Sequence, residues 1–163
     1  MEQFEKSSEM PVSARELYDW HMQPGTFEKL VPPWQKVKVL ERPERLQEGA
    51  RLVMKVYLGP IGVRWVAHHR DFVQGRQFVD EQLEGPFAHW VHTHRFEPQG
   101  PDASTLVDRI VYELPLGPLG RLFGRRATRA MLERMFAYRH QVTRLELAES
   151  DLPPTSTPGR TSA

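Results

Sequence analysis

The residues of this sequence best suited to chemistry are two histidines and one aspartate. His92 and His94 are two positions apart in a segment in which apolar residues alternate, so a β-strand points both imidazoles, and Trp90, to one face. If the next hairpin closes at Gln99-Gly100, the register sets His94 opposite Asp108. The pattern therefore predicts a His–Asp pair that joins two adjacent strands.

The preceding segment adds a carboxylate and an amide to the same face. A turn at Gly85-Pro86 places Phe78 near His92. Asp80 then lies near the tryptophan of that strand, and Gln82 follows further along the same face. We therefore expect carboxylates, imidazoles and aromatic rings to share one interior surface.

The polar residues of this surface have two opposing interpretations. In one, they are the polar wall of an otherwise apolar pocket and fix the orientation of a ligand hydroxyl or carbonyl. In the other, they satisfy one another, with His94 paired with Asp108 and the Trp90 indole N–H donated to Asp80, and only fix the strand register. The residues in question are Asp80, Gln82, His92, His94 and Asp108.

Two kinds of chemistry also remain open. As a general base oriented by Asp108, His94 could drive the enolisation that precedes an aldol cyclisation. As metal ligands, His92, His94 and Asp108 offer two imidazoles and a carboxylate, which could bind zinc or iron. Two histidines on one strand face arise easily by chance, so we expect neither a metal nor another cofactor. No recognised motif places a serine or a lysine as a nucleophile.

Seven strands and three helices are expected to position these residues. A first strand over residues 2–9 precedes two short helices over residues 14–20 and 26–30, and a capping box of Ser13 and Glu16 opens the first of them. A period of two then predicts a meander of strands at 35–42, 50–58, 62–73, 76–83, 87–97 and 104–114. After Pro118, a helical period predicts one long amphipathic helix over residues 119–148. Its recurring apolar residues are Leu119, Leu122, Phe123, Ala127, Ala130, Met131, Tyr138, Val142 and Leu145.

A sheet that is apolar on one face must bury that face, and the long helix is the element of matching size. The sequence therefore predicts an α+β fold in which a curved, seven-stranded antiparallel sheet wraps around the long C-terminal helix. One domain is expected over residues 1–149. The segment 150–163 has too little apolar content to offset its ordering entropy and is expected to be disordered.

Length and composition narrow the classes of function. The chain has 163 residues, which suits one domain, and its 22 basic and 21 acidic residues give no field suited to DNA or RNA. The absence of cysteine excludes disulfides, thiolate nucleophiles and sulfur-ligated metals. The sequence has neither a signal-peptide pattern nor a run of about 18 apolar residues, so we expect a cytoplasmic protein without stable membrane insertion.

The order of these elements resembles the helix-grip fold of the START-like, or SRPBCC, superfamily, which includes polyketide cyclases and coenzyme Q-binding proteins. The resemblance covers residues 3–148. Within the superfamily, the sequence resembles one bacterial branch, whose members are mostly described as cyclase/dehydrase-like or ligand-binding. Its most specific residues are Phe78-Val79-Asp80-Glu81-Gln82-Leu83-Glu84-Gly85-Pro86-Phe87, Trp90, His92, His94, Phe96, Asp108, Tyr112, Leu114, Pro115 and Gly117.

The resemblance implies a cavity between the sheet and the long helix that accepts a lipid-like or aromatic molecule, and it implies no particular reaction. Large apolar residues along the strands and the helix are candidates for its lining, although such residues more often fill a core. The candidates are Tyr57, Trp65, Phe78, Trp90, Tyr112, Phe123, Met131 and Met135.

Three hypotheses of function follow. The first is a non-enzymatic protein that binds or transports a small hydrophobic molecule, such as a quinone, isoprenoid, fatty acid or polyketide. The second is a cyclase/dehydrase-like enzyme that uses His94 and Asp108, and the third is an interaction module whose own side chains fill the cavity. Arg121, Arg125 and Arg129 form an i, i+4 stripe that could contact an acidic partner or anionic lipid head groups, although a solvated face is the simpler interpretation.

Overall fold

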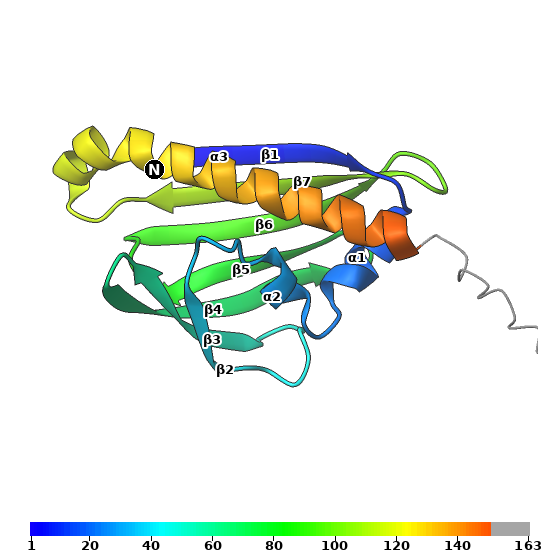
Figure 1. The fold of residues 1–163 in the computed structure, drawn as a ribbon, viewed down its shortest axis with the longest axis horizontal. Coiled ribbons are helices and arrows are strands. Elements are labelled where there is room, and N and C mark those ends of the chain that lie inside the picture. Colours follow the sequence, from blue (N-terminus) through cyan, green and yellow to red (C-terminus); the bar gives the residue numbers. More distant parts are fainter. Residues whose placement is uncertain (151–163) are drawn as a thin grey trace, which may run out of the picture.

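The computed structural model describes residues 1–150, apart from the side chains of residues 118–121, 123 and 150. Of the tail expected to be disordered, residues 151–163 lie outside the described part. The elements are β1 (Glu2–Met10), α1 (Ala14–His21), α2 (Thr26–Leu30), β2 (Val37–Glu41), β3 (Arg51–Leu58), β4 (Ile61–Val73), β5 (Gln77–Glu84), β6 (His89–Pro98), β7 (Ser104–Glu113) and α3 (Gly117–Ser150). Figure 1 shows α3 lying along the sheet, which confirms the predicted α+β helix-grip architecture.

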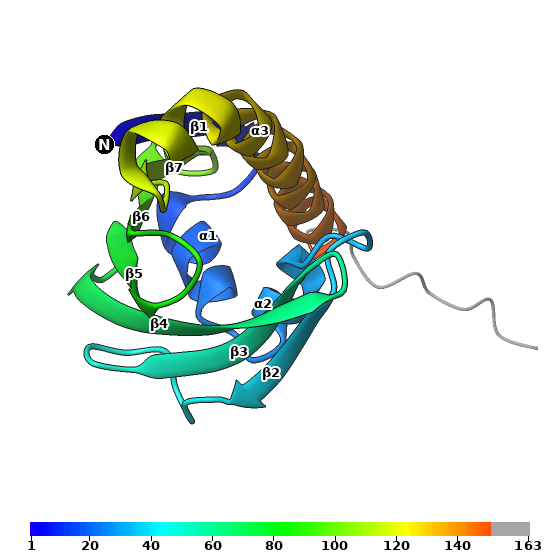
Figure 2. The same ribbon diagram turned by 90° about the vertical axis from the view of Figure 1, so that its left-hand side faces the viewer.

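One antiparallel sheet of seven strands, in the order β1-β7-β6-β5-β4-β3-β2, forms the framework. Figure 2 shows that the sheet curves strongly and that α1 and α2 lie within its curve. Helix α3 packs against β1, β7 and α2. The helix therefore covers one side of the concave face and leaves room over the strands on the other side.

The register between β6 and β7 agrees with the sequence pattern. His94 lies opposite Asp108 and Trp90 lies opposite Tyr112, as predicted. Because side chains of a strand alternate between faces, these residues share the concave face of the sheet. The two strands thus bring the predicted imidazole and carboxylate together.

The predicted register between β5 and β6 is wrong by two residues. Phe78 lies opposite His94 rather than His92. The reason is the length of the β5–β6 loop, which is wider than a tight turn at Gly85-Pro86. Gln82 supports this loop, because its side-chain amide donates to the Phe87 carbonyl over 2.8 Å and accepts from the Phe87 N–H over 3.3 Å. Since the shift is an even number of residues, every side chain stays on its predicted face.

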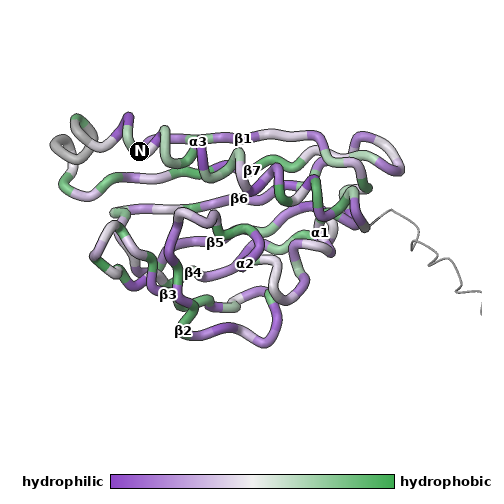
Figure 3. The backbone as a smooth tube through the Cα atoms, viewed as in Figure 1, coloured by the Kyte–Doolittle hydropathy of each residue, from purple (hydrophilic) through white to green (hydrophobic). Residues whose placement is uncertain are grey.

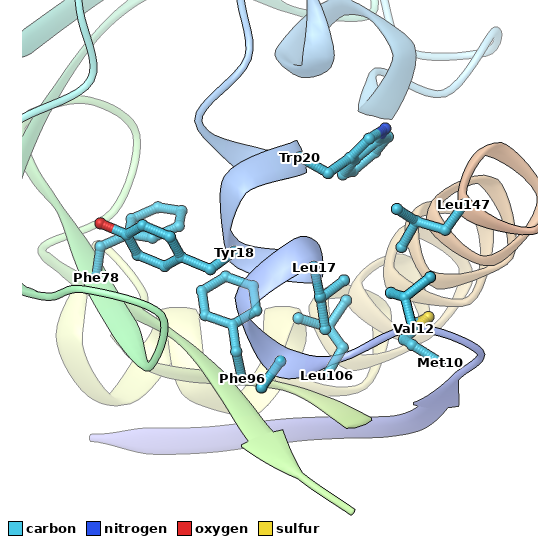
Figure 4. Close-up of a cluster of buried hydrophobic side chains, with 10 residues drawn as sticks. Met10, Val12, Leu17, Tyr18, Trp20, Phe78, Phe96, Leu106 and Leu147 are labelled. Carbon is cyan, nitrogen blue, oxygen red and sulfur yellow. The ribbon is translucent and has the colours of Figure 1, made fainter. Parts of the chain in front are cut away.

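Helix α1 closes one end of the curved sheet. The predicted capping box is present, because the Ser13 hydroxyl accepts from the backbone N–H of Glu16 and the Glu16 carboxylate accepts from the backbone N–H of Ser13. In Figure 4 the helix presents Leu17 to a core that also contains Leu106 of β7 and Leu147 of α3. This packing fixes the end of the sheet against the last turns of α3.

The buried stripe of α3 differs from the predicted one. In Figure 3, hydrophobic and hydrophilic stretches alternate along this helix. However, Leu122 and Leu145, predicted as part of the apolar face, are 75% and 55% exposed. The prediction followed apolar residues alone, whereas the true stripe includes two polar ones. Its buried members are Leu132, Phe136, His140, Thr143 and Leu147.

No helix in residues 1–150 is long and apolar enough to cross a membrane.

A substitution of Leu132 tests which side of α3 is buried. The side chain is fully buried against the sheet, so Leu132→Ala should lower the free energy of unfolding by about 2–5 kcal/mol. Leu145→Ala, on the exposed side of the same helix, should change it by less than about 0.5 kcal/mol. Urea denaturation of both variants measures the difference. Equal losses from the two substitutions would show that the helix is rotated relative to this description.

Candidate functional site

A cavity of about 430 Å³ lies between the sheet, α2 and α3. Strand β3 contributes Leu52, Met54 and Val56 to its wall, and other apolar residues come from β4, the β5–β6 loop and α3. A smaller set of lining residues is polar and includes His21, His69, Asp80, His92, His94 and Arg139. The cavity is therefore mainly apolar, with titratable groups in one part of its wall.

The polar lining residues are neighbours in space. The His94 ring stacks on Phe78 with centroids 4.2 Å apart, and the His21 ring lies 6.1 Å from His94. On the other side of Phe78, the His69 ring is 6.4 Å away. Asp80 lies opposite His92 in the sheet, and not near Trp90 as the predicted register had it. The Phe78 ring on β5 therefore lies between the imidazole of His69 on β4 and that of His94 on β6.

Most of the ligand-binding residues expected from the sequence lie at this cavity. They are Trp65, Phe78, Asp80, Trp90, His92, His94, Met131 and Met135. The side chain of Phe123 lies outside the described residues.

Four expected ligand-binding residues do not line the cavity. Tyr57 points to the outer face of β3, where its ring lies 4.6 Å from the Lys36 ammonium, because the inward positions are those of its neighbours in sequence. Gln82 is engaged by the β5–β6 loop. Tyr112 is 2% exposed and belongs to the core beneath α3, and Asp108 is covered by the histidines.

Asp108 is the centre of a buried polar cluster. Its Oδ1 accepts a hydrogen bond from His92 Nε2 over 2.8 Å, and its Oδ2 accepts one from His140 Nε2 over 2.8 Å. His94 Nδ1 also lies 2.8 Å from Oδ1, although its orientation is not that of a hydrogen bond. One carboxylate thus connects β6, β7 and α3.

Asp80 meets the same two histidines from the cavity side. Its Oδ2 accepts a hydrogen bond from His94 Nε2 over 3.0 Å and lies 3.2 Å from His92 Nδ1. His92 and His94 are therefore each placed between two carboxylates. This arrangement is richer than the single His–Asp pair expected from the sequence.

The charges of the cluster follow from this geometry. Burial disfavours the ionised form of Asp80 and Asp108, but the surrounding imidazoles, which at Asp108 include His140, outweigh it and hold both carboxyl pKa values well below the usual range. Burial also disfavours a charged His92, yet the Asp80 charge and the hydrogen bonds to both aspartates raise its pKa to about 9. At neutral pH the cluster therefore contains two carboxylates and an imidazolium.

His21 and His69 differ from the clustered histidines. Burial, and to a lesser degree the charge of His94, lowers the pKa of His21 to about 4, and burial also lowers the pKa of His69. Nδ1 of His21 lies 2.8 Å from the Leu17 carbonyl, and Nδ1 of His69 lies 3.2 Å from the Ala50 carbonyl. A carbonyl only accepts, so Nδ1 carries the proton and each Nε2 keeps its lone pair. Two neutral imidazoles thus offer acceptors to the cavity.

Arg139 adds a guanidinium to the cavity wall. Its Nε donates to the Leu30 carbonyl at the end of α2 over 3.2 Å. Burial lowers its pKa, which the charges of Asp108 and Asp80 partly restore. The side chain therefore links α2 to α3 and presents a positive group to the interior.

Sequence reasoning missed His21, His140 and Arg139. A signal existed for His140, because it lies four residues after Phe136 in the buried stripe of α3. A polar residue at a core position of a helix requires a partner, which here is Asp108. Arg139, which directly precedes His140, gives no such signal. In the sequence it cannot be told apart from the several exposed arginines of α3.

The arginine stripe is partly occupied within the chain. Arg125 pairs with Glu2 over 2.8 Å, and Arg129 pairs with Glu133 over 3.2 Å. The side chain of Arg121 lies outside the described part. These pairs favour the simpler interpretation of a solvated face over an acidic partner.

Comparisons with known proteins agree with the fold. The curved sheet and the long terminal helix have the helix-grip architecture of START-like, or SRPBCC, proteins. More narrowly, the chain belongs to the polyketide cyclase / dehydrase and lipid transport family, whose model matches residues 10–136. A search of curated proteins finds no match.

Several solved structures have the same architecture. TTHA0849 from Thermus thermophilus is 14% identical, with a TM-score of 0.72 over 93% of this chain and 100% of that one. The ZhuI aromatase/cyclase from a Streptomyces species is 16% identical, with a TM-score of 0.70 over 96% and 99%. A START superfamily protein from Mycobacterium smegmatis is 14% identical, with a TM-score of 0.64 over 91% and 98%. At these identities the similarity shows the fold alone.

Asp108 tests whether the cluster holds the fold together. Asp108→Asn keeps the shape of the side chain but removes the charge, which leaves the His92 imidazolium with one carboxylate. The free energy of unfolding should fall by about 3–5 kcal/mol, as measured by urea denaturation. Asp19→Asn removes an exposed partner of Arg15 and should cost less than about 1 kcal/mol. A loss at Asp108 no larger than at Asp19 would contradict a structural role for the cluster.

Proposed function

We propose that this protein binds a small hydrophobic ligand that carries one polar group. The observation that supports this most directly is the cavity of about 430 Å³, whose wall is mainly apolar and has its titratable residues gathered in one part. Ligand pockets of drug-sized molecules have this size range and this composition. The cavity also argues against an interaction module whose interior is filled by its own side chains.

The lining suggests how such a ligand is oriented. Its apolar body fits against Trp65, Phe87 and Met135, where two rings and a flexible thioether offer contact area. Its polar group faces the imidazoles and Arg139, which together provide hydrogen-bond donors and acceptors. A quinone, a fatty acid, an isoprenoid alcohol or a polyketide satisfies both requirements.

The family supports the same class of ligand. Its description names lipid transport together with polyketide cyclases and dehydrases. The ZhuI protein, which shares the fold, is named an aromatase/cyclase. Binding of a hydrophobic molecule is common to these descriptions, and we therefore place it first.

A substitution that fills the cavity tests the proposal. Met135→Trp adds volume at the wall, and it should weaken binding of a fluorescent fatty acid or a displacing quinone by about tenfold or more. Leu145→Trp makes the same kind of change at an exposed position of α3 and should leave the affinity unchanged. Fluorescence titration measures both. If the unmodified protein binds none of a panel of quinones, fatty acids and aromatic polyketides, the proposal fails.

A second candidate function is a dehydrase-like enzyme that uses His94. This residue lines the cavity, and both of its ring nitrogens face carboxylates, Nε2 toward Asp80 and Nδ1 toward Asp108. A carboxylate beside an imidazole fixes its tautomer and ring orientation, which supports the general-base role expected from the sequence.

His94→Gln separates the two candidate functions. If His94 is the general base, kcat for conversion of the bound ligand should fall by roughly two to four orders of magnitude, with affinity changed by less than about tenfold. Single-turnover assays with a ligand identified by native mass spectrometry provide the measurement. An undiminished rate in the variant would exclude this role, and the absence of any turnover in the unmodified protein would leave binding as the function.

A further inference from the structure

We propose that Asp80, His92 and His94 bind one divalent first-row transition-metal ion at the polar wall of the cavity. Each residue offers one ligand atom, and these atoms all lie within 4.8 Å of one another. This inference goes beyond the proposed function, because an ion can bind here whether or not an organic ligand enters the cavity.

The spacing of the atoms suits a single ion. Asp80 Oδ2 lies 3.0 Å from His94 Nε2 and 3.2 Å from His92 Nδ1. Ligand atoms at about 2.1 Å from one metal, at angles of about 90–110°, lie about 3.0–3.4 Å apart. Both separations from Asp80 are in this range, and a modest movement of the rings closes the His92–His94 separation, which is at most 4.8 Å.

Asp108 supports the two histidines from behind. Its Oδ1 lies 2.8 Å from His92 Nε2 and 2.8 Å from His94 Nδ1, which are the nitrogens that face away from Asp80. Metal-binding histidines generally donate their second ring N–H to a carboxylate or a carbonyl, which fixes the ring orientation. In this structure His94 Nδ1 is buried without a hydrogen bond among the described residues, and a small ring rotation would direct its proton to Asp108.

His140 completes this second layer. Its Nε2 donates to the other Asp108 oxygen over 2.8 Å and so anchors the carboxylate to α3. Asp108 therefore serves to orient the histidines, and Asp80 takes the ligand role that the sequence pattern assigned to Asp108. The difference follows from the position of α3, which covers Asp108 and leaves Asp80 at the cavity.

Charge and donor type indicate the class of ion. Two carboxylates carry a charge of −2, which a divalent ion balances once it has displaced the His92 proton that faces Asp80, so that both imidazoles are neutral ligands. Two nitrogen donors and one oxygen donor suit Zn²⁺, Fe²⁺ or Co²⁺ better than Mg²⁺ or Ca²⁺, which prefer oxygen ligands. The three proposed ligands all line the cavity.

Titration with metal ions alone tests the inference. The full chain, freed of metals with a chelator, should bind one Zn²⁺ in isothermal titration calorimetry, and one Co²⁺ should give visible absorption bands typical of nitrogen and oxygen ligands. Asp80→Asn and His94→Gln should each weaken binding by about 100-fold. His68→Gln is the matched control, because this histidine is on β4 but does not line the cavity, and its affinity should equal that of the unmodified protein.

The results of the metal titration do not depend on those of the ligand-binding experiments, because no organic ligand is added. Circular dichroism establishes that each variant is folded, and the Co²⁺ spectrum of the unmodified protein gives an independent result if a variant is not. The inference is overturned if neither ion binds at one per chain. It is also overturned if both folded variants bind as tightly as His68→Gln, which would place the ion elsewhere.

Discussion

A buried negative charge between the sheet and the long helix constrains this protein most strongly. Asp108 is 3% exposed, and removing a carboxylate from water is costly unless several donors surround it. His92 and His140 donate to it, and these residues come from β6 and α3. Because Asp108 itself is on β7, its hydrogen bonds determine where α3 lies on the sheet. The position of α3 in turn determines which strands remain uncovered.

The cavity is a consequence of that position. Helix α3 contacts β1 and β7, and its apolar residues fill the space over these strands. Over β3, β4 and β5 the corresponding space is bounded by α2 and by the cavity-facing side of α3, and it stays open. The polar cluster lies at the boundary between these two regions, with Asp108 on the packed side and Asp80 on the open side. A ligand in the cavity therefore meets both an apolar wall and the edge of a charged network.

The sequence predicted the fold well because strands and helices depend on local periodicity. It also predicted that His94 faces Asp108, since a short hairpin limits the possible registers. The β5–β6 register was wrong because loop length depends on the side-chain contacts of Gln82, which alternation does not reveal. His140 was missed because the search for a helical stripe followed apolar residues only. The partners of a buried charge come from elements distant in sequence, and no local pattern contains them.

Strand β3 lines the cavity without taking part in the polar cluster, so the shape of the cavity can change in evolution without loss of the cluster. Leu52, Met54 and Val56 shape the wall, yet this strand contributes no residue to the polar cluster. Residues that determine which molecule fits are thus separate from those that hold the helix to the sheet. Changes on β3 can alter the shape of the accepted molecule while the scaffold is preserved. A redesign of specificity would best begin with this strand.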